Sequence, residues 1–207
     1  MHFSVDNFDK LDKFFRRNLI NSVTGFKSLN LVGTQNNNGL TNLAPFSQVF
    51  HIGASPAYIG LLIRPDSVER HTLDNIEFTK FYTLNHVLSS FYKQAHQSSA
   101  RYHVSEFEAT GLTPEYSSLL PAPYVKEANI KIGLQFEQRN DIRLNGTILI
   151  IGSIQELFVP DDCIGEDGMI DLEKAGTITC SGLDTYHTTQ KLARLSYAKP
   201  DKDLFEI

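Results

Sequence analysis

The sequence predicts a mainly β protein with peripheral helices, in which the strands form an antiparallel β-barrel. Strand-like stretches outnumber helical ones, Asn-Gly turns join strands into hairpins, and strand–helix–strand units do not repeat. Of the 207 residues, 41% are hydrophobic and 21% are charged, which is typical of a globular protein with a packed core. Because no linker or internal repeat marks a boundary, we expect one domain over residues 1–207.

The N-terminal part of the chain predicts one helix followed by three strands. Apolar residues recur at helical spacing over residues 8–20, with Asp6 or Asn7 as the capping residue. Strands are predicted at residues 28–34, 41–52 and 58–63. The first two strands flank a turn that ends at Gly39, and an Asn-Gly turn in this position is the strongest short-range signal of a β-hairpin.

The middle of the chain predicts short helices around one further strand. Helices are expected at residues 72–78 and 88–100, the first with Thr72 as its cap, and a strand is expected at residues 81–87. Residues 106–124 contain Gly111 and three prolines, which indicates turns and short helices.

The C-terminal part predicts a long hairpin followed by an acidic loop. Residues 128–138 and 147–159 are rich in Ile, Leu and Val and flank the turn at Asn145-Gly146. Residues 156–173 hold seven acidic residues and no Lys or Arg, so we expect a loop exposed to solvent.

Several classes of function are disfavoured by composition. The formal net charge of −5 is opposite in sign to a nucleic-acid-binding surface, and no apolar run is long enough for a membrane span. The first residues do not resemble a signal peptide, so we expect a cytoplasmic protein. The two cysteines, Cys163 and Cys180, and the scattered histidines lack the spacing of metal ligands, so no metal site is expected.

One stretch of the sequence departs from the strand pattern in a way that suits a ligand. Within residues 41–52, Asn42, Ala44 and Ser47 replace the β-branched residues that strands prefer, and Pro45 removes a backbone donor. Small side chains and unpaired backbone groups allow a ligand to approach the main chain closely.

A second set of residues suggests an anion site. Arg64 ends the predicted strand 58–63, and His71 and Thr72 begin the helix that follows. An arginine near free amides at a helix start is suited to binding phosphate. The alternative is purely structural: residues 42–47 form a bulge, Arg64 pairs with Asp66 or Glu69, and Thr72 only caps its helix.

Taken in order, these segments and several later ones resemble the flavin reductase-like family of FMN-binding split barrels, which includes the flavoredoxin-like proteins. The similar segments are residues 34–47, Ser55-Pro56, Arg64, residues 71–76, 81–85, 107–113, 148–159 and 182–186. The resemblance extends over about residues 18–200, and the ordered set is more specific than any single segment.

The resemblance implies an FMN-binding split barrel with FMN as cofactor and NADH or NADPH as co-substrate. The cofactor-binding residues that it implies are Thr34, Asn42, Leu43, Ala44, Ser47, Arg64, His71 and Thr72. Asn42, Leu43, Ala44 and Ser47 would face the flavin ring. Arg64, His71 and Thr72 would hold the phosphate. Either Arg70 or His71 would reach the phosphate.

Three later residues fall in family-like segments with less direct roles. Asn85 and His86 are interpreted as buried structural residues, and a contact between them and the bound cofactor remains an alternative. Tyr186 is interpreted as a residue that packs in the core or at an interface. The resemblance also implies a homodimer with FMN near the interface. We expect the dimer to form through barrel surfaces, on aromatic residues Phe14, Phe15, Phe46, Phe50 and Tyr186.

The implied activity is hydride transfer from NAD(P)H to flavin N5, for which no catalytic side chain is predicted because the cofactor carries the chemistry. Two alternatives remain at this point. The protein could be an electron-transfer protein that binds FMN without a nicotinamide site, or a dimeric barrel that binds no flavin.

Overall fold

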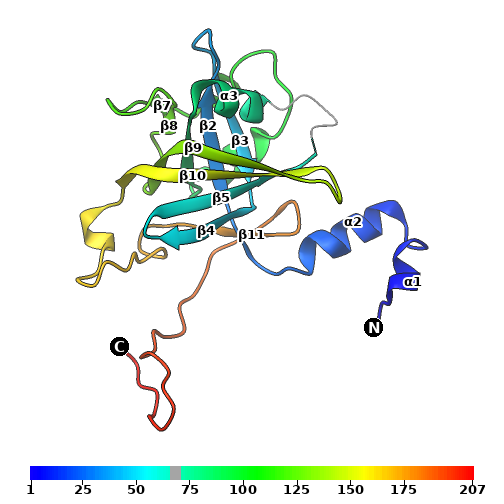
Figure 1. The fold of residues 1–207 in the computed structure, drawn as a ribbon, viewed down its shortest axis with the longest axis vertical. Helices are drawn as coiled ribbons and strands as arrows, with labels where there is room; N and C mark the ends of the chain where they lie inside the picture. The colour runs from blue at the N-terminus through cyan, green and yellow to red at the C-terminus, as the bar shows by residue number, and fades with distance from the viewer. Residues whose placement is uncertain (66–70) are drawn as a thin grey trace.

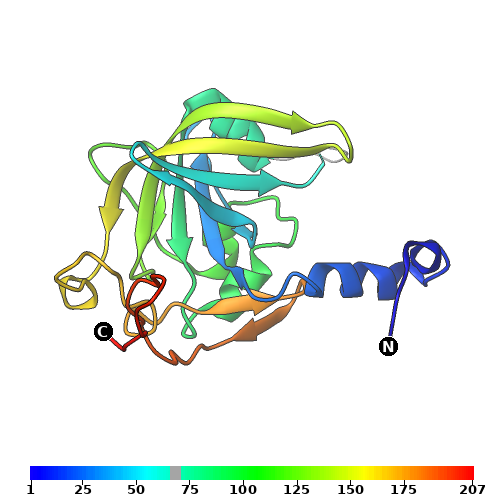
Figure 2. The same cartoon turned by 60° about the horizontal axis from the view of Figure 1, so that its bottom comes forward.

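A seven-stranded antiparallel sheet curls into an open barrel, as Figures 1 and 2 show. The computed structural model describes residues 1–65 and 71–207. In the order in which they pair, the strands are β3 (Thr41–Phe46), β2 (Asn30–Gln35), β6 (Phe81–His86), β9 (Lys131–Ile142), β10 (Thr147–Phe158), β5 (Ala57–Ile63) and β4 (Val49–Ala54). The predicted mainly β, antiparallel architecture is therefore confirmed.

Two smaller sheets and short helices surround the barrel. The small strands are β1 (Lys27–Ser28), β11 (Thr179–Ser181) and β12 (Thr185–His187) in one sheet, and β7 (Pro114–Glu115) with β8 (Tyr124–Val125) in the other. The helices are α1 (Val5–Phe8), α2 (Lys13–Ser22), α3 (His71–Thr79), α4 (Tyr92–Gln97), α5 (Glu106–Thr110) and the 3-10 turn η1 (Asp161–Cys163). Across residues 1–65 and 71–207, no helix has the length and apolar character needed to cross a membrane.

The alternation of side chains along β2 and β3 produces two separate cores. Val32 points into the barrel, where it packs with buried residues of β5, β6, β9, β10 and α3; we call this cluster the inner core. Leu31 and Leu43 belong instead to a cluster outside the barrel, with Phe91 and Phe107 from the region of α4 and α5; we call this cluster the outer core. The outer core fixes α4 and α5 against the sheet beside β3, which positions the loops around the site.

The single strand predicted over residues 41–52 is wrong, because the chain forms two strands there, β3 and β4, at opposite edges of the sheet. β3 and β4 lie at opposite ends of the strand order, and the chain passes between them through Ser47 and Gln48. The carbonyl of Gln48 accepts the backbone N–H of Leu62 at 2.9 Å. The proposed bulge in residues 42–47 is also absent, since β2 and β3 pair in regular register from Asn30 with Phe46 to Gln35 with Thr41.

The predicted helix over residues 8–20 is two helices. The side chain of Asp12 accepts the backbone N–H groups of Phe14 and Phe15 at 2.9 and 3.0 Å, so α2 begins after Asp12. Ser4, and neither Asp6 nor Asn7, stands at the N-cap position of α1. α1 ends at Phe8 with Asp9 as its C-cap, and the side chain of Asp12 starts α2.

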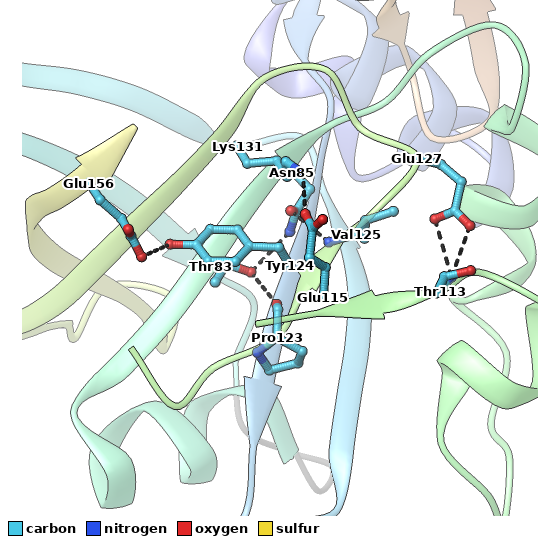
Figure 3. A network of polar contacts seen from close by, with 10 residues as sticks. All are labelled: Thr83, Asn85, Thr113, Glu115, Pro123, Tyr124, Val125, Glu127, Lys131 and Glu156. Carbon is cyan, nitrogen blue, oxygen red and sulfur yellow. Dashed lines mark hydrogen bonds and ion pairs between the residues drawn. The ribbon is translucent and has the colours of Figure 1, made fainter. Parts of the chain in front are cut away.

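Two other predicted elements are shorter than expected. The helix predicted over residues 88–100 is reduced to α4, and the predicted acidic loop includes the end of β10 and the buried Cys163. Glu156 in that segment is a structural acceptor: it takes hydrogen bonds from the hydroxyls of Ser117 and Tyr124, the latter at 2.8 Å (Figure 3). Burial and the neighbouring Glu156 carboxylate raise the pKa of Tyr124.

Candidate functional site

A cavity of about 490 Å³ opens beside β3, in the region where the chain crosses from β3 to β4. β3 and the residue after it contribute Asn42, Leu43, Ala44 and Ser47 to its lining. The end of β5 and the start of α3 contribute Arg64, His71 and Thr72. The fold therefore brings together both sets of residues that the sequence singled out, with Thr34 as the exception.

Within residues 1–65 and 71–207, no strand pairs with the outer edge of β3, and its backbone groups lie beside the cavity. The backbone N–H of Leu43 donates to Glu106 Oε2 at 3.0 Å, so it points away from β2. Because N–H groups alternate in direction along an antiparallel strand, Pro45 also turns outward, where its missing N–H disturbs no ladder. The side chain of Leu43 is fully buried in the outer core, so only its backbone can face a ligand.

Asn42 is held by two threonine hydroxyls, one in the cavity lining and one outside it. Its Nδ2 donates to Thr72 Oγ1 at 3.1 Å and to Thr34 Oγ1 at 3.3 Å, and Asn75 Nδ2 donates to the same Thr34 oxygen at 3.0 Å. Thr34 is fully buried and is not among the residues that line the cavity. Its contacts tie β2, β3 and α3 together and orient Asn42.

The cationic side of the cavity combines a strand end with a helix start. Arg64 and His71 are exposed, whereas Thr72 is 7% exposed. Thr72 lies inside the first turn of α3, and its hydroxyl accepts a hydrogen bond from Asn42, so the prediction that it caps the helix is wrong. The choice between Arg70 and His71 as the phosphate contact involves a residue outside the described part of the chain.

The alternative in which Arg64 pairs with Asp66 or Glu69 likewise concerns residues outside the described ranges.

Several polar residues of the cavity were not predicted from the sequence, and three of them carry ionisable side chains close to β3 in the lining. These are Glu106 at the start of α5, Arg101 in the loop before it, and His96 in α4. Glu106 is held against β3 by the Leu43 contact and by the neighbouring hydroxyl pair of Thr41 and Ser105 at 2.6 Å. These three residues lie near β3 because the outer core packs α4 and α5 against the sheet. No local pattern in the sequence predicts that packing.

Tyr186 packs against the outer core, as predicted, and also lines the cavity. Its hydroxyl lies 2.6 Å from Nδ1 of His96, and its ring is tilted against that of Tyr92 at 5.5 Å. Burial raises the pKa of Tyr186. The β11–β12 hairpin and α4 therefore form one connected wall.

Asn85 and His86 are structural and do not line the cavity. Asn85 Nδ2 donates to the Leu31 carbonyl and to Thr83 Oγ1, both at 3.0 Å, and its Oδ1 accepts the N–H of Val125 at 2.9 Å (Figure 3). His86 Nδ1 lies 3.1 Å from Thr177 Oγ1, and burial lowers its pKa to about 4.

Comparisons with known proteins agree with this fold. A solved split-barrel protein of Shewanella frigidimarina NCIMB 400, provisionally classed as a flavin reductase, is 50% identical, with a TM-score of 0.92 over 96% of this chain and 100% of that chain. Nitrilotriacetate monooxygenase component B of Bacillus cereus is 21% identical and has the same fold, with a TM-score of 0.80 over 92% of this chain and 98% of that chain. An uncharacterized protein of Aquifex aeolicus (strain VF5) is 27% identical over 147 residues, which are 69% of this chain and 74% of that protein.

The family model of the flavin reductase like domain matches residues 27–174, which include every strand of the barrel and every residue predicted for the site. The split-barrel fold and the family resemblance seen in the sequence are thereby confirmed. The chain belongs to the flavin reductase like domain family.

Proposed function

We propose that this flavin reductase-like protein binds FMN in the cavity beside β3 and accepts hydride from NADH or NADPH. The observation that carries the proposal is the arrangement of the cavity: an unpaired strand edge with small side chains adjoins Arg64 and the start of α3. A flat ring system with hydrogen-bonding edges fits the first part, and a phosphate fits the second.

The cavity suits FMN in size and in the chemistry of its donors. Its volume of about 490 Å³ falls within the range of roughly 300–1,000 Å³ that is usual for small-molecule sites. A phosphate brings nearly two negative charges to a chain of net charge −5, so local cations must outweigh the long-range repulsion. Arg64 is placed to do so, and a charge-assisted hydrogen bond contributes about 1.5–3 kcal/mol.

The protein's own part in the reaction is binding and orientation. FMN, when bound, supplies the redox chemistry that no side chain of the cavity can perform. We assign Arg64, His71 and Thr72 to the phosphate, and Asn42 with the backbone and small side chains of residues 43–47 to the ring. Thr34 is assigned as a positioning residue, because it contacts Asn42 and Asn75 from behind the wall.

We further propose a homodimer. Phe14, Phe15 and Phe50 are 61%, 49% and 44% exposed, which is consistent with surfaces that a second chain covers. Phe46 and Tyr186, which the sequence also suggested, are half-buried and pack against the inner and outer cores.

The activity is tested with the purified protein loaded with FMN under anaerobic conditions. We expect a yellow preparation whose visible flavin absorbance is bleached by NADH or NADPH. Bound flavin that neither nucleotide bleaches, but that dithionite does, would favour the electron-transfer alternative. A protein that fails to retain or titrate FMN would contradict the assignment of the cavity altogether.

A further inference from the structure

Glu106 brings a carboxylate to the wall of the cavity beside β3. Among the described residues that line the cavity it is the only acid, whereas Arg64 and Arg101 line it as cations. The side chain belongs to the first residue of α5 and is half-buried. The negative charge of the described cavity wall therefore comes from this one residue.

Contacts on both sides of Glu106 fix the position of its carboxylate. Oε2 accepts the backbone N–H of Leu43 at 3.0 Å. The preceding residue, Ser105, is the N-cap of α5, and its hydroxyl oxygen lies 2.6 Å from Thr41 Oγ1 on β3. The following residue, Phe107, is 3% exposed and belongs to the outer core. Glu106 is thus held against β3 by its own side chain and by both of its neighbours.

The charge of the Glu106 carboxylate is not neutralised by a described cation. None of the ion pairs formed within residues 1–65 and 71–207 includes Glu106. The hydrogen bond that its side chain makes within these ranges comes from the Leu43 amide. A neutral amide donor orients a carboxylate and stabilises it but leaves its net charge in place. A ligand in the cavity is therefore exposed to this charge.

The adjoining edge of β3 does not offset this negative charge with free donors. The Leu43 N–H is occupied by Glu106, and Pro45 has no N–H. The carbonyl groups of these two residues face the same outer side, because both backbone groups of a residue in an antiparallel strand point the same way. Two carbonyl oxygens and one carboxylate thus give this side of the cavity a negative character, whereas Arg64 is positive.

We propose that Glu106 lowers the reduction potential of the flavin bound in this cavity. This inference rests on the FMN binding proposed above. The ring of oxidised FMN is neutral, and two-electron reduction with uptake of one proton leaves it anionic near neutral pH. A fixed carboxylate in the wall repels the added charge, so it weakens the binding of reduced FMN more than that of oxidised FMN. The bound flavin is thereby a stronger electron donor to an acceptor.

The size of the cavity sets the expected magnitude of the effect. A sphere of 490 Å³ is about 10 Å across, and at that separation and an effective dielectric constant of about 20, repulsion between two unit charges changes an equilibrium constant roughly tenfold. For a two-electron couple, a tenfold change corresponds to about 30 mV. We therefore expect the charge of Glu106 to hold the midpoint potential about 30 mV below its value with a neutral side chain.

The test is an anaerobic redox titration of the FMN-loaded Glu106→Gln variant against a reference dye, with dithionite as reductant. Glutamine keeps the shape of the side chain, and its amide oxygen can still accept the Leu43 N–H. We expect a midpoint potential about 30 mV above that of the wild type, equivalent to a tenfold gain in affinity for reduced over oxidised FMN. The matched control is Glu108→Gln, the same change at an exposed residue of α5 that does not line the cavity, and it should leave the potential unchanged.

The charge-retaining variant Glu106→Asp separates charge from shape, and it should keep the potential of the wild type. If Glu106→Gln does not fold, Glu106→Ala should show the same rise in potential.

Each outcome distinguishes the role of Glu106 from the proposed function. An unchanged potential in the neutral variants, or an equal shift in Glu108→Gln, would overturn the role of Glu106 while leaving FMN binding intact. A wild-type protein that does not bind FMN in titration would overturn both proposals. Because dithionite supplies the electrons, a protein that NADH and NADPH fail to reduce still gives a potential, so loss of the nicotinamide reaction alone leaves the role of Glu106 decided by its own variants.

Discussion

His96 and Tyr186 are joined by a hydrogen bond of 2.6 Å between Nδ1 and the phenolic oxygen, although 90 positions separate them in the chain. Their rings meet almost at right angles, with centroids 5.8 Å apart, and both residues line the cavity. The contact connects α4 to the β11–β12 hairpin. The shape of this wall therefore depends on one exposed imidazole and one half-buried phenol.

Replacing Tyr186 by Phe should loosen this wall without unfolding the protein. Loss of one hydrogen bond costs about 0.5–1.5 kcal/mol, and the ring that packs on the outer core is retained. We expect several-fold weaker binding of FMN and of riboflavin alike, because neither His96 nor Tyr186 is among the residues assigned to the phosphate. Fluorescence titration measures both flavins. If the His96–Tyr186 hydrogen bond is responsible, the double variant His96→Ala/Tyr186→Phe should lose little more flavin affinity than either single variant. Additive losses of affinity would contradict a coupling between the two residues.

Arg64→Ala should weaken FMN binding about tenfold or more and leave riboflavin binding almost unchanged. The reason is that Arg64 supplies a charge-assisted hydrogen bond of about 1.5–3 kcal/mol to a phosphate that riboflavin lacks. Lys199→Ala, an exposed residue of the C-terminal tail, controls for the change in net charge. Equal losses for the two flavins would show that Arg64 supports the fold and does not hold the phosphate.

Thr72→Val should have a smaller effect that still favours riboflavin over FMN. The change removes one hydroxyl but keeps the backbone amides of the first turn of α3. It also removes the acceptor of the Asn42 amide, which retains its contact with Thr34. We therefore expect a moderate loss of FMN affinity by isothermal titration and a slight loss of stability. A loss of FMN affinity as large as that of Arg64→Ala would mean that Thr72 acts mainly through its contact with Asn42 and not through the phosphate.

The protein should lose stability as the pH is lowered, because His86 titrates differently in the folded and unfolded states. Burial lowers its pKa from about 6.5 to about 4, so between these values the unfolded chain binds a proton that the folded chain does not. Stability must therefore rise with pH across this window, and at pH 5 the loss relative to pH 7.5 reaches at most about 2 kcal/mol. Urea unfolding at both pH values measures it. His86→Gln, which can still bond Thr177, should lose less stability than the wild type over the same interval.

Local chemistry in the sequence predicted the antiparallel barrel and singled out segments that border the cavity, whereas the cofactor-binding roles came from the family resemblance. The turns at Asn38-Gly39 and Asn145-Gly146 lie between paired strands, as expected, since both glycines adopt the positive φ that such turns require. The irregular composition of residues 42–47 marked a strand edge beside a cavity. Arg64 and the start of α3 were recognisable because strand ends and helix starts have sequence signals of their own.

Contacts between distant segments were beyond the sequence. Leu43 donates its N–H to Glu106, 63 positions away, and nothing around Glu106 distinguishes it from an ordinary surface acid. Thr34 was predicted to bind the cofactor; its hydroxyl accepts hydrogen bonds from the amides of Asn42 and Asn75, and it is not among the residues that line the cavity. The alternation of side chains along a strand predicts on which face of the sheet a residue lies. It does not predict which polar groups other segments of the chain place on that face.

The sequence by itself determined the elements that short-range forces set: the hairpins, the hydrophobic strands and the polar signals at their ends. Only the tertiary structure decided which faces of those elements meet, because that choice depends on burying the two cores simultaneously. The outer core fixes α4 and α5 beside β3 and so creates the His96–Tyr186 wall. The predicted helix over residues 8–20 is likewise interrupted: α1 ends at Phe8, and α2 starts only after the side-chain cap of Asp12, in a segment that contains no buried residue to hold one continuous helix.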